Sequence, residues 1–327
     1  MNKRQFVMLL GGIAAIPRVA HAQQSEGMRT LAMLSSTDSG PYLDARVLSF
    51  QQELQRLGWI EGRNLRFVLR NSVGDPQTIR TDAAELVALA PDIIVTSSNL
   101  STVIVSRLTR TIPIVFANAG DPVGTGLVAN MARPGGNITG FASYEVAIGG
   151  KWMELLKELV PRLSRVTMLY TVSGGGSEGT RRVLESAAPG LGVRVTSVPA
   201  VDLPTIEQAV GALAASADAG LIVLPGPSTA SHSQAIIESA IRHRIPAVYN
   251  NKFFTVAGGL MSYSSDPIDL YRRSASYVDR ILRGEKPGDL PVQAPTKFEL
   301  VINLKAAKTM GLTIPEAFLL RADQVIE

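Results

Sequence analysis

The feature that most constrains the fold is a strand-and-loop pattern that occurs twice in the chain. Residues 112–118 read IPIVFAN and residues 245–251 read IPAVYNN, and both fit Ile-Pro-x-Val-(aromatic)-x-Asn. In each copy the apolar run is short and rich in β-branched residues, as in a parallel strand that is buried on both faces. Each run ends at an asparagine, Asn118 in the first copy and Asn251 in the second.

Predicted strands and helices alternate ahead of both copies. The strands expected ahead of the two copies are 29–34, 65–69, 92–95, 166–170, 193–198 and 221–224. Such alternation with short loops is typical of a doubly wound parallel sheet. The two series also align in order. The first contains PDIIVTSSN, a helix and then IPIVFAN, and the second contains AGLIVLPGP, a helix and then IPAVYNN. The sequence therefore predicts an α/β protein with two Rossmann-like lobes of the same architecture.

The chain is expected to pass between these lobes three times. Lobe one is assigned residues 29–143 and 257–287, which include a strand expected at 258–262, and lobe two is assigned residues 147–253 and 290–327. The three crossings then fall near residues 143–148, 252–257 and 286–292. Together they would form a hinge.

Residues 1–22 have the features of an export signal. Lys3 and Arg4 precede an apolar stretch, and Ala20-His21-Ala22 fits a small-x-small cleavage site. The Lys-Arg pair also resembles a twin-arginine signal with one Lys replaced, so general secretion and the twin-arginine route both stay open. We expect a soluble protein in the periplasm.

Composition excludes several classes of function. The chain has 32 basic and 28 acidic residues, but the predicted signal contains three of the basic residues and none of the acidic ones. The rest of the chain is therefore nearly neutral and offers no basic patch for nucleic acid. It has no cysteine, which excludes disulfides, thiolate metal sites and a lipid-modified cysteine anchor. No histidines and carboxylates have metal-ligand spacing, so no metal or other cofactor is expected.

Polar residues follow the predicted strands in both lobes. Ligands of open α/β sheets bind outside the carboxyl ends of the strands, and two facing lobes would form a cleft there. The candidate ligand-binding residues are Ser35, Ser36, Ser97, Ser98, Asn99, Asn118 and Asp121 in lobe one, and Ser173, Pro225, Gly226, Tyr249 and Asn251 in lobe two.

These residue types indicate different roles. Residues 97–99 stand where a strand becomes a helix, and hydroxyls and N–H groups there can hold a carboxylate or another anion. Plain helix capping explains the same residues. Asn118 and Asn251 are expected to form hydrogen bonds with a ligand, and Tyr249 to pack against its apolar part. Asp121 either meets a ligand cation or forms a turn, and the turn is favoured.

The segment SGGGSEG, residues 173–179, fits two enzyme patterns at once. Its glycines satisfy G-x-G-x-x-G, with Asp202 downstream, as in a dinucleotide-binding fingerprint. Ser177 is also the centre of G-x-S-x-G, the pattern of a nucleophile elbow. An exported nicotinamide enzyme would be unusual. A hydrolase needs a histidine on a late loop, whereas His232 and His243 fall in one expected helix. We favour a flexible glycine loop at the cleft rim and no enzyme activity; a secreted serine hydrolase using Ser177 is the alternative.

Three stretches carry a family resemblance. They are DPVGTGLVANMARPGGNITG from residue 121, GGLMSYSSD from residue 258 and PTKFELVINLKAAKTMGLTIP from residue 295. They resemble the extracytoplasmic substrate-binding proteins of ABC importers, in the family that includes tryptophan and tyrosine binders. The resemblance implies a type I periplasmic-binding-protein fold whose lobes close on a small molecule without catalysis. It also implies a monomer that delivers this molecule to an ABC permease in the membrane, which works with a cytoplasmic ATPase.

One departure from the family bears on the ligand. Amino-acid binders of this type tend to have an acidic residue where Asn251 aligns, and an asparagine cannot neutralise a ligand ammonium group. The expected ligand is therefore a small polar molecule such as an amino acid or an aromatic acid. A periplasmic sensor that reports ligand occupancy to a receptor would have the same fold and stays open.

Overall fold

The structure is a computed structural model that describes residues 27–36, 40–72, 76–172, 176–216 and 218–327. The predicted export signal, residues 1–22, lies outside these ranges. Among the described residues, none of the helices has both the length and the apolar character that a membrane span requires.

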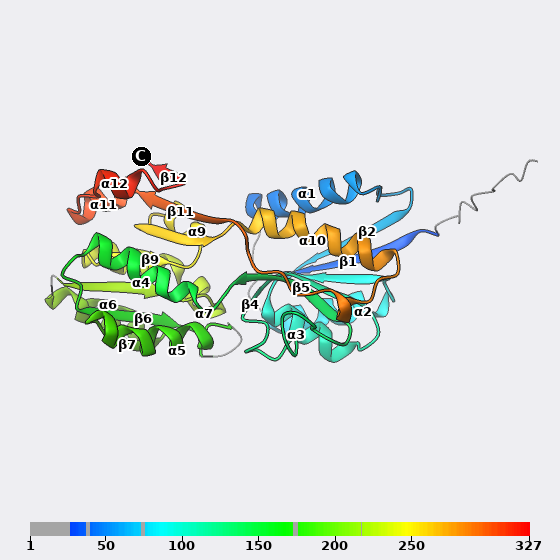
Figure 1. Cartoon of the computed structure of the whole chain (residues 1–327), viewed down its shortest axis with the longest axis horizontal. Helices are drawn as coiled ribbons and strands as arrows, with labels where there is room; N and C mark the ends of the chain where they lie inside the picture. Colours follow the sequence, from blue (N-terminus) through cyan, green and yellow to red (C-terminus); the bar gives the residue numbers. More distant parts are fainter. Residues whose placement is uncertain (1–26, 37–39, 73–75, 173–175, 217) are drawn as a thin grey trace, which may run out of the picture.

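Lobe one is built on a five-stranded sheet (Figure 1). Its spatial order is β2-β1-β3-β4-β5, and all four pairings are parallel. The strands are β1 (Arg29–Ser35), β2 (Leu65–Asn71), β3 (Ile93–Thr96), β4 (Ile114–Gly120) and β5 (Ile138–Tyr144). The helices of this lobe are α1 (Pro41–Arg56), α2 (Pro76–Ala88), α3 (Asn99–Leu108) and α10 (Pro267–Leu282).

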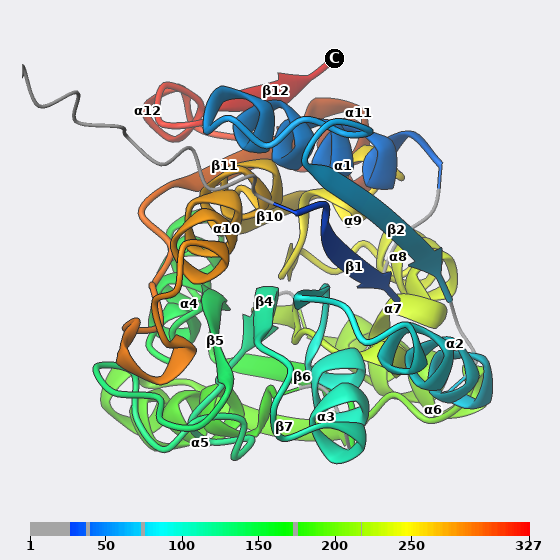
Figure 2. The ribbon, with the colours of Figure 1, turned by 90° about the vertical axis from the view of Figure 1, so that its right-hand side faces the viewer.

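Helices cover both faces of this sheet (Figure 2). Side chains alternate along a strand, so neighbours in β1 pack on opposite sides. Leu31 and Met33 join the apolar side chains of α1 and α10, whereas Ala32 and Leu34 join those of α2 and α3. The buried, apolar strands of the sequence therefore form the doubly wound arrangement that their pattern predicts.

Lobe two contains a seven-stranded sheet in the order β12-β11-β10-β9-β8-β6-β7. Its pairings are parallel except the one between β10 and β11. The strands are β6 (Arg165–Tyr170), β7 (Arg194–Pro199), β8 (Ala219–Val223), β9 (Ala247–Tyr249), β10 (Met261–Ser265), β11 (Phe298–Asn303) and β12 (Gln324–Ile326). The α-helices are α4 (Ile148–Leu159), α5 (Glu178–Ala187), α6 (Leu203–Gly211), α7 (Pro227–Ser231), α8 (Ser233–Arg242), α9 (Lys252–Val256), α11 (Leu304–Met310) and α12 (Glu316–Leu319). Short 3-10 helices of this lobe are η1 (Ala188–Leu191) and η2 (Ala212–Ala215), whereas η3 (Pro287–Asp289) contacts β5 of lobe one.

The predicted fold class is confirmed, but one lobe boundary is wrong. β10 was expected in lobe one, yet it pairs with β9 and, antiparallel, with β11. Leu260 and Met261 are consequently buried in the lobe-two core. The local pattern of 258–262 indicates a strand but cannot reveal its neighbours, because β11 comes much later in the chain. The helix after it, α10, does pack on lobe one, against α1, β4 and β5.

Two of the three crossings therefore lie later in the chain than expected. The second follows Ser265, at the end of β10. The third lies beyond Gln293, because Val292 and Gln293 still donate backbone hydrogen bonds to Met131 and Gly140 of lobe one.

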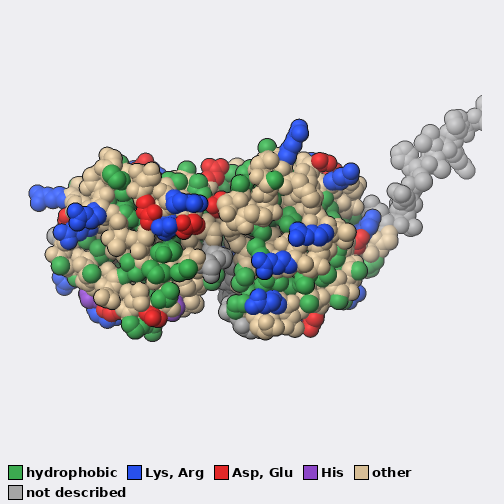
Figure 3. Space-filling view, turned by 90° about the horizontal axis from the view of Figure 1, so that it is seen from below, with side chains coloured by type: hydrophobic (Ala, Val, Ile, Leu, Met, Phe, Trp, Pro, Cys, Tyr) green, Lys and Arg blue, Asp and Glu red, His purple; other side chains and the backbone are tan. Residues whose placement is uncertain are grey.

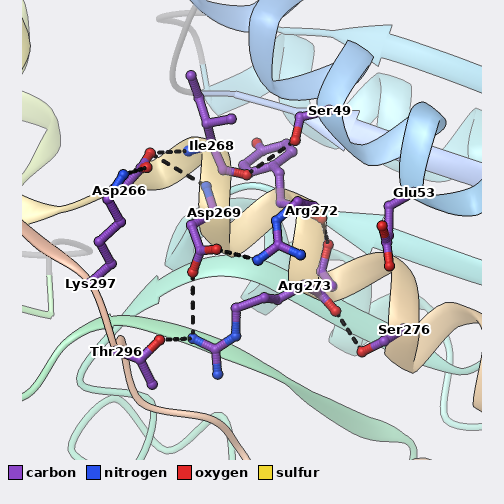
Figure 4. A network of polar contacts seen from close by, with 12 residues as sticks. Ser49, Glu53, Asp266, Ile268, Asp269, Arg272, Arg273, Ser276, Thr296 and Lys297 are labelled. Atoms are coloured by element: carbon purple, nitrogen blue, oxygen red, sulfur yellow. Dashed lines mark hydrogen bonds and ion pairs between the residues drawn. The ribbon is translucent and has the colours of Figure 1, made fainter.

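The three crossings lie side by side. The Ser265 hydroxyl donates to the carbonyl of Ser143 at 2.5 Å, and the Asp266 N–H donates to the carbonyl of Lys297 at 3.3 Å. The Lys297 ammonium is 2.9 Å from the carboxylate of Asp266, which also caps α10 by accepting from the N–H of Ile268 (Figure 4). One ion pair thus joins the second and third crossings.

Candidate ligand-binding site

The carboxyl ends of the parallel strands in each lobe point toward the other lobe. β5 runs parallel to β4 and ends at the first crossing, and β10 runs parallel to β9 and ends at the second. All strands parallel to them therefore end on the side of the neighbouring lobe. In the space-filling view the surface is notched between the lobes (Figure 3). The candidate residues that the structure describes lie at or next to these facing strand ends.

Serine hydroxyls gather at the end of β1 and the start of α3. The Ser36 N–H donates to the Ser97 hydroxyl at 2.8 Å, and the hydroxyls of Ser36 and Ser98 are 2.7 Å apart. Ser98 also caps α3 by accepting from the N–H of Ser101 at 3.2 Å. The neighbouring Ser35 is fully buried, and its hydroxyl has no hydrogen-bond partner among the described residues. These hydroxyls lie at the positive end of a helix, which favours an anion.

Asn99 and Asp121 shape the loop after β4. The Asn99 amide donates to the carbonyl of Gly120 at 2.6 Å and accepts from its N–H at 2.7 Å. The Asp121 carboxylate accepts from the N–H of Gly124 at 2.9 Å, and Asp121 itself has a φ of 42°. Asp121 thus forms the turn that the sequence favoured. The amide of Asn99, which is buried, is engaged with the backbone of β4.

Asn118 lies at an irregularity in β4. Phe116 pairs with Gly140, but Ala119 pairs with Ala142, so the register of β4 shifts around Asn118. A bulge of this kind redirects a side chain at the end of a strand. Asn118 is half-buried, and its amide forms no hydrogen bond with any residue that the structure describes.

Asn251, which the repeat pairs with Asn118, occupies a different local setting. Its Oδ1 accepts from the N–H of Phe253 at 2.9 Å and so caps α9. The amide nitrogen of Asn251 has no partner among the described residues. The preceding Asn250 donates to the carbonyl of Val223 at 2.9 Å and ties β9 to the end of β8. Asn251 can still donate one amide group to a ligand.

The loops after β6 and β8 are joined by a hydroxyl pair that sequence reasoning missed. The hydroxyls of Thr171 and Ser228 are 2.8 Å apart. Gly226 lies so close that a Cβ there would clash with the Thr171 hydroxyl oxygen. Pro225 and Gly226 are half-buried beside this pair, whereas Ser173 lies outside the described residues. In the sequence, the only indication of the pair between Thr171 and Ser228 is that each residue comes after a predicted strand. Many other residues also come after predicted strands.

Tyr249 lies in the core of lobe two and not on a wall between the lobes. Its side chain is fully buried, and its ring stacks on Phe254 with centroids 5.0 Å apart. Gly259 leaves room for this ring, because a Cβ there would be 2.5 Å from it. Burial raises the pKa of Tyr249, whose hydroxyl has no hydrogen-bond partner among the described residues.

The described part of the glycine segment touches lobe one. The Tyr144 hydroxyl donates to the carbonyl of Gly176 at 2.9 Å. A Cβ on Gly176 would be 2.5 Å from the Gly120 carbonyl oxygen and 2.6 Å from the Asn99 amide nitrogen. A Cβ on Gly179 would be 2.6 Å from the carboxylate of Asp121. The glycines thus permit close approach between the two lobes. Gly174, the first glycine of the fingerprint, lies outside the described residues.

The same segment lacks the neighbours of a serine nucleophile. Ser177 is only 2% exposed. His232 Nδ1 is 2.8 Å from the carbonyl oxygen of Ser228, and His243 Nε2 is 2.7 Å from the carboxylate of Glu207. Neither histidine forms a hydrogen bond with Ser177 among the described residues.

Two Rossmann-like lobes with facing strand ends and three crossings define a type I periplasmic binding protein. Residues 34–326 match the family described as ABC transporter substrate binding protein, and the chain belongs to this family. The resemblance inferred from the sequence is confirmed.

Individual relatives cover nearly the whole chain. A tyrosine-binding protein of Clostridioides difficile (strain R20291) is 24% identical over 325 residues, which cover 95% of this chain and 93% of that protein. The ABC domain of Streptococcus pneumoniae, solved in complex with L-Trp, has a TM-score of 0.83 and 27% identity and covers 92% of this chain and 100% of that one. A conserved domain protein of Vibrio cholerae has a TM-score of 0.82 and 29% identity over 91% of this chain and 99% of that one.

Proposed function

We propose that this chain is the periplasmic binding component of an ABC importer for a small molecule that carries a carboxylate. An aromatic amino acid or an aromatic acid is the ligand to test first. The observation that carries the proposal is the cluster of Ser36, Ser97 and Ser98 hydroxyls at the N-terminus of α3, at a strand end that faces lobe two. The similarity to proteins named for tyrosine and solved with L-Trp supports the ligand class.

The polar groups divide into three proposed roles. The serine cluster, with Ser35 behind it, holds the ligand carboxylate. Asn118 from lobe one and the Asn251 amide nitrogen from lobe two bind the remaining polar groups. The loops that contain Asp121, Ser173, Pro225 and Gly226 complete the walls. Tyr249 supports the wall from the core.

Closure of the hinge is the proposed mechanism. A ligand that contacts both lobes only in the closed form shifts the equilibrium toward that form by its differential affinity. The contacts between Ser143 and Ser265 and between Asp266 and Lys297 hold the crossings together while the lobes rotate. The permease, with its cytoplasmic ATPase, then accepts the closed, loaded protein. Export by the signal in residues 1–22 places the chain in the periplasm.

A thermal-shift screen of residues 23–327 tests this function. The panel contains L-Trp, L-Tyr, phenylpyruvate, benzoate, and matched amides that lack the carboxylate. We expect at least one carboxylate to raise the melting temperature in a concentration-dependent way and its amide to have no such effect. Ser98→Ala should lower the affinity for that ligand by about 10- to 100-fold, which corresponds to the loss of one hydrogen bond to a charged group.

The matched control is Ser106→Ala on the same helix, because among the described residues the Ser106 hydroxyl donates to the carbonyl of Val103 alone. This variant should bind like the wild type. A screen without any stabilising carboxylate, or equal affinity in the Ser98 variant, would overturn the proposal.

A further inference from the structure

A pair of arginines lies at the end of lobe two that is remote from the facing strand ends. Arg165 begins β6 and Arg194 begins β7, and the two residues are register partners on adjacent strands. Their side chains therefore project from the same face of the sheet. Both are exposed. Like charges placed directly opposite each other on neighbouring strands destabilise a sheet. The pair concentrates positive charge on this exposed face of lobe two.

Among the described residues, few acidic groups offset the charge of Arg165 and Arg194. Neither arginine forms an ion pair or a side-chain hydrogen bond with a described residue. Asp218 is near enough for Arg165 to help lower its pKa, but the larger cause of that shift is the hydrogen bond from the Ser164 hydroxyl. Asp202 caps α6 by accepting from the N–H of Thr205 at 2.8 Å. The main partners of these two carboxylates are therefore Ser164 and Thr205 and not the arginines.

Two hollows border the arginine pair. One of about 460 Å³ extends toward α6, and another of about 400 Å³ extends toward η1. The first has an apolar floor that includes Val198 and Leu213, and it is also lined by Thr167, Thr196 and Gln208, residue types that can donate hydrogen bonds. Among the residues that the structure describes, no acidic side chain lines either hollow. A volume of this size lies within the range of small-molecule sites, roughly 300–1,000 Å³.

We propose that this face of lobe two binds an amphipathic organic anion. Its phosphate, sulfonate or carboxylate head lies between the guanidinium groups of Arg165 and Arg194, and its apolar body lies on the floor beside α6. Guanidinium groups form paired, charge-assisted hydrogen bonds with such heads. The site contacts lobe two alone and lies at the amino ends of β6 and β7, so its occupancy does not require the lobes to close.

Titration calorimetry of residues 23–327 with phenyl phosphate and with inorganic phosphate tests the site. We expect saturable binding of phenyl phosphate, weaker binding of inorganic phosphate, and an affinity that falls as salt is added. The double variant Arg165→Gln/Arg194→Gln should bind phenyl phosphate at least about tenfold more weakly. Arg162→Gln, a change of an exposed arginine that lines neither hollow, is the matched control and should bind normally.

Two further measurements distinguish this site from the region between the lobes and from a general loss of stability. Without any anion, the double variant should melt at or above the wild-type temperature, because a repulsive pair has been removed. Asn118→Ala, which alters the region between the lobes, should leave phenyl phosphate binding unchanged. The proposal is overturned by absent or non-saturable binding to the wild type, by equal affinity in the double variant, or by loss of binding in the Asn118 variant.

Discussion

The side chain of Asn99 holds the backbone of Gly120 by two hydrogen bonds, one in each direction, at 2.6 and 2.7 Å. Both groups are buried, so the start of α3 and the end of β4 are fixed to each other. The loop after β4 depends on this contact. It also brings Gly120 to the position where Gly176 of lobe two meets it.

Asn99→Ala should therefore destabilise lobe one. It leaves a buried carbonyl and a buried N–H without partners, at a cost of about 1–3 kcal/mol for each group. Asn99→Asp keeps the acceptor but places a carboxylate oxygen against the carbonyl oxygen of Gly120 in a buried position, so it should be at least as unstable as Asn99→Ala. Urea denaturation of the three proteins checks this order, and equal midpoints for wild type and Asn99→Ala would refute it.

Gly176→Ala should hinder the approach of the two lobes. The added methyl group would be 2.5 Å from the Gly120 carbonyl oxygen, and the backbone has a φ of 66° that disfavours side chains. Small-angle X-ray scattering should show a larger radius of gyration, and ligand affinity should fall by about tenfold or more. Gly150→Ala is the control, because a Cβ there meets no atom within 4 Å and Gly150 lies within α4. Unchanged scattering and affinity in the Gly176 variant would show that the contact does not limit closure.

The ion pair between Asp266 and Lys297 gives the hinge a dependence on acid pH. Burial raises the pKa of Asp266, but hydrogen bonds from Lys297 and from the N–H groups of Ile268 and Asp269 outweigh it, so the pKa is lowered overall. A depressed carboxyl pKa contributes stability above its unfolded value of about 3.9, and that stability is lost as the pH falls through the folded pKa.

Asp266→Asn keeps an oxygen for capping α10 but removes the charge. We expect its melting temperature at neutral pH to be lower by about 2–4 °C, the shift for roughly 1 kcal/mol in a domain of this size. The difference from wild type should shrink as the pH falls below the unfolded pKa of about 3.9 and disappear once the pH is below the lowered folded pKa. A constant difference across the whole pH range would mean that the charge of Asp266 does not act as described.

Asn251→Asp tests whether the charge at this position selects the ligand. The substitution retains an oxygen that can accept from the N–H of Phe253 and cap α9, and it replaces the amide nitrogen by a carboxylate oxygen. Free amino acids should gain about tenfold in affinity from the new ion pair with their ammonium group, whereas acids that lack an amine should lose affinity. Calorimetry with L-Trp and indole-3-acetate provides the comparison. A well-folded variant that binds both ligands as the wild type does would rule out this role for the charge.

Local patterns predicted most of the architecture. The β-branched runs that end in polar residues at 112–118 and 245–251 mark β4 and β9, because a strand buried on both faces needs such a composition. The lobe assignment of β10 failed since it depends on antiparallel pairing with β11, a contact between distant segments. Short elements such as α9 and β12 have too few residues to show a period.

The orientation of individual site residues was less predictable. Asn99 and Tyr249 follow or end strands as Asn118 does, yet Asn99 bonds to backbone and Tyr249 stacks in the core. The register of β4 shifts around Asn118, and the space beside Gly259 admits the Tyr249 ring. These determinants come from neighbouring elements. The sequence could therefore name the strand ends but could not decide which side chains face the opposite lobe.

Titration calorimetry of the wild type, Asn118→Ala and Asn130→Ala with the best ligand of the carboxylate screen is the most direct test of binding between the lobes. Asn130 serves as the control, because it is an exposed loop residue whose side chain accepts from the N–H of Arg133. We predict that Asn118→Ala lowers the affinity for the ligand by about tenfold or more and that Asn130→Ala binds the ligand as the wild type does. Equal affinity in all three proteins would contradict binding of the ligand between the lobes.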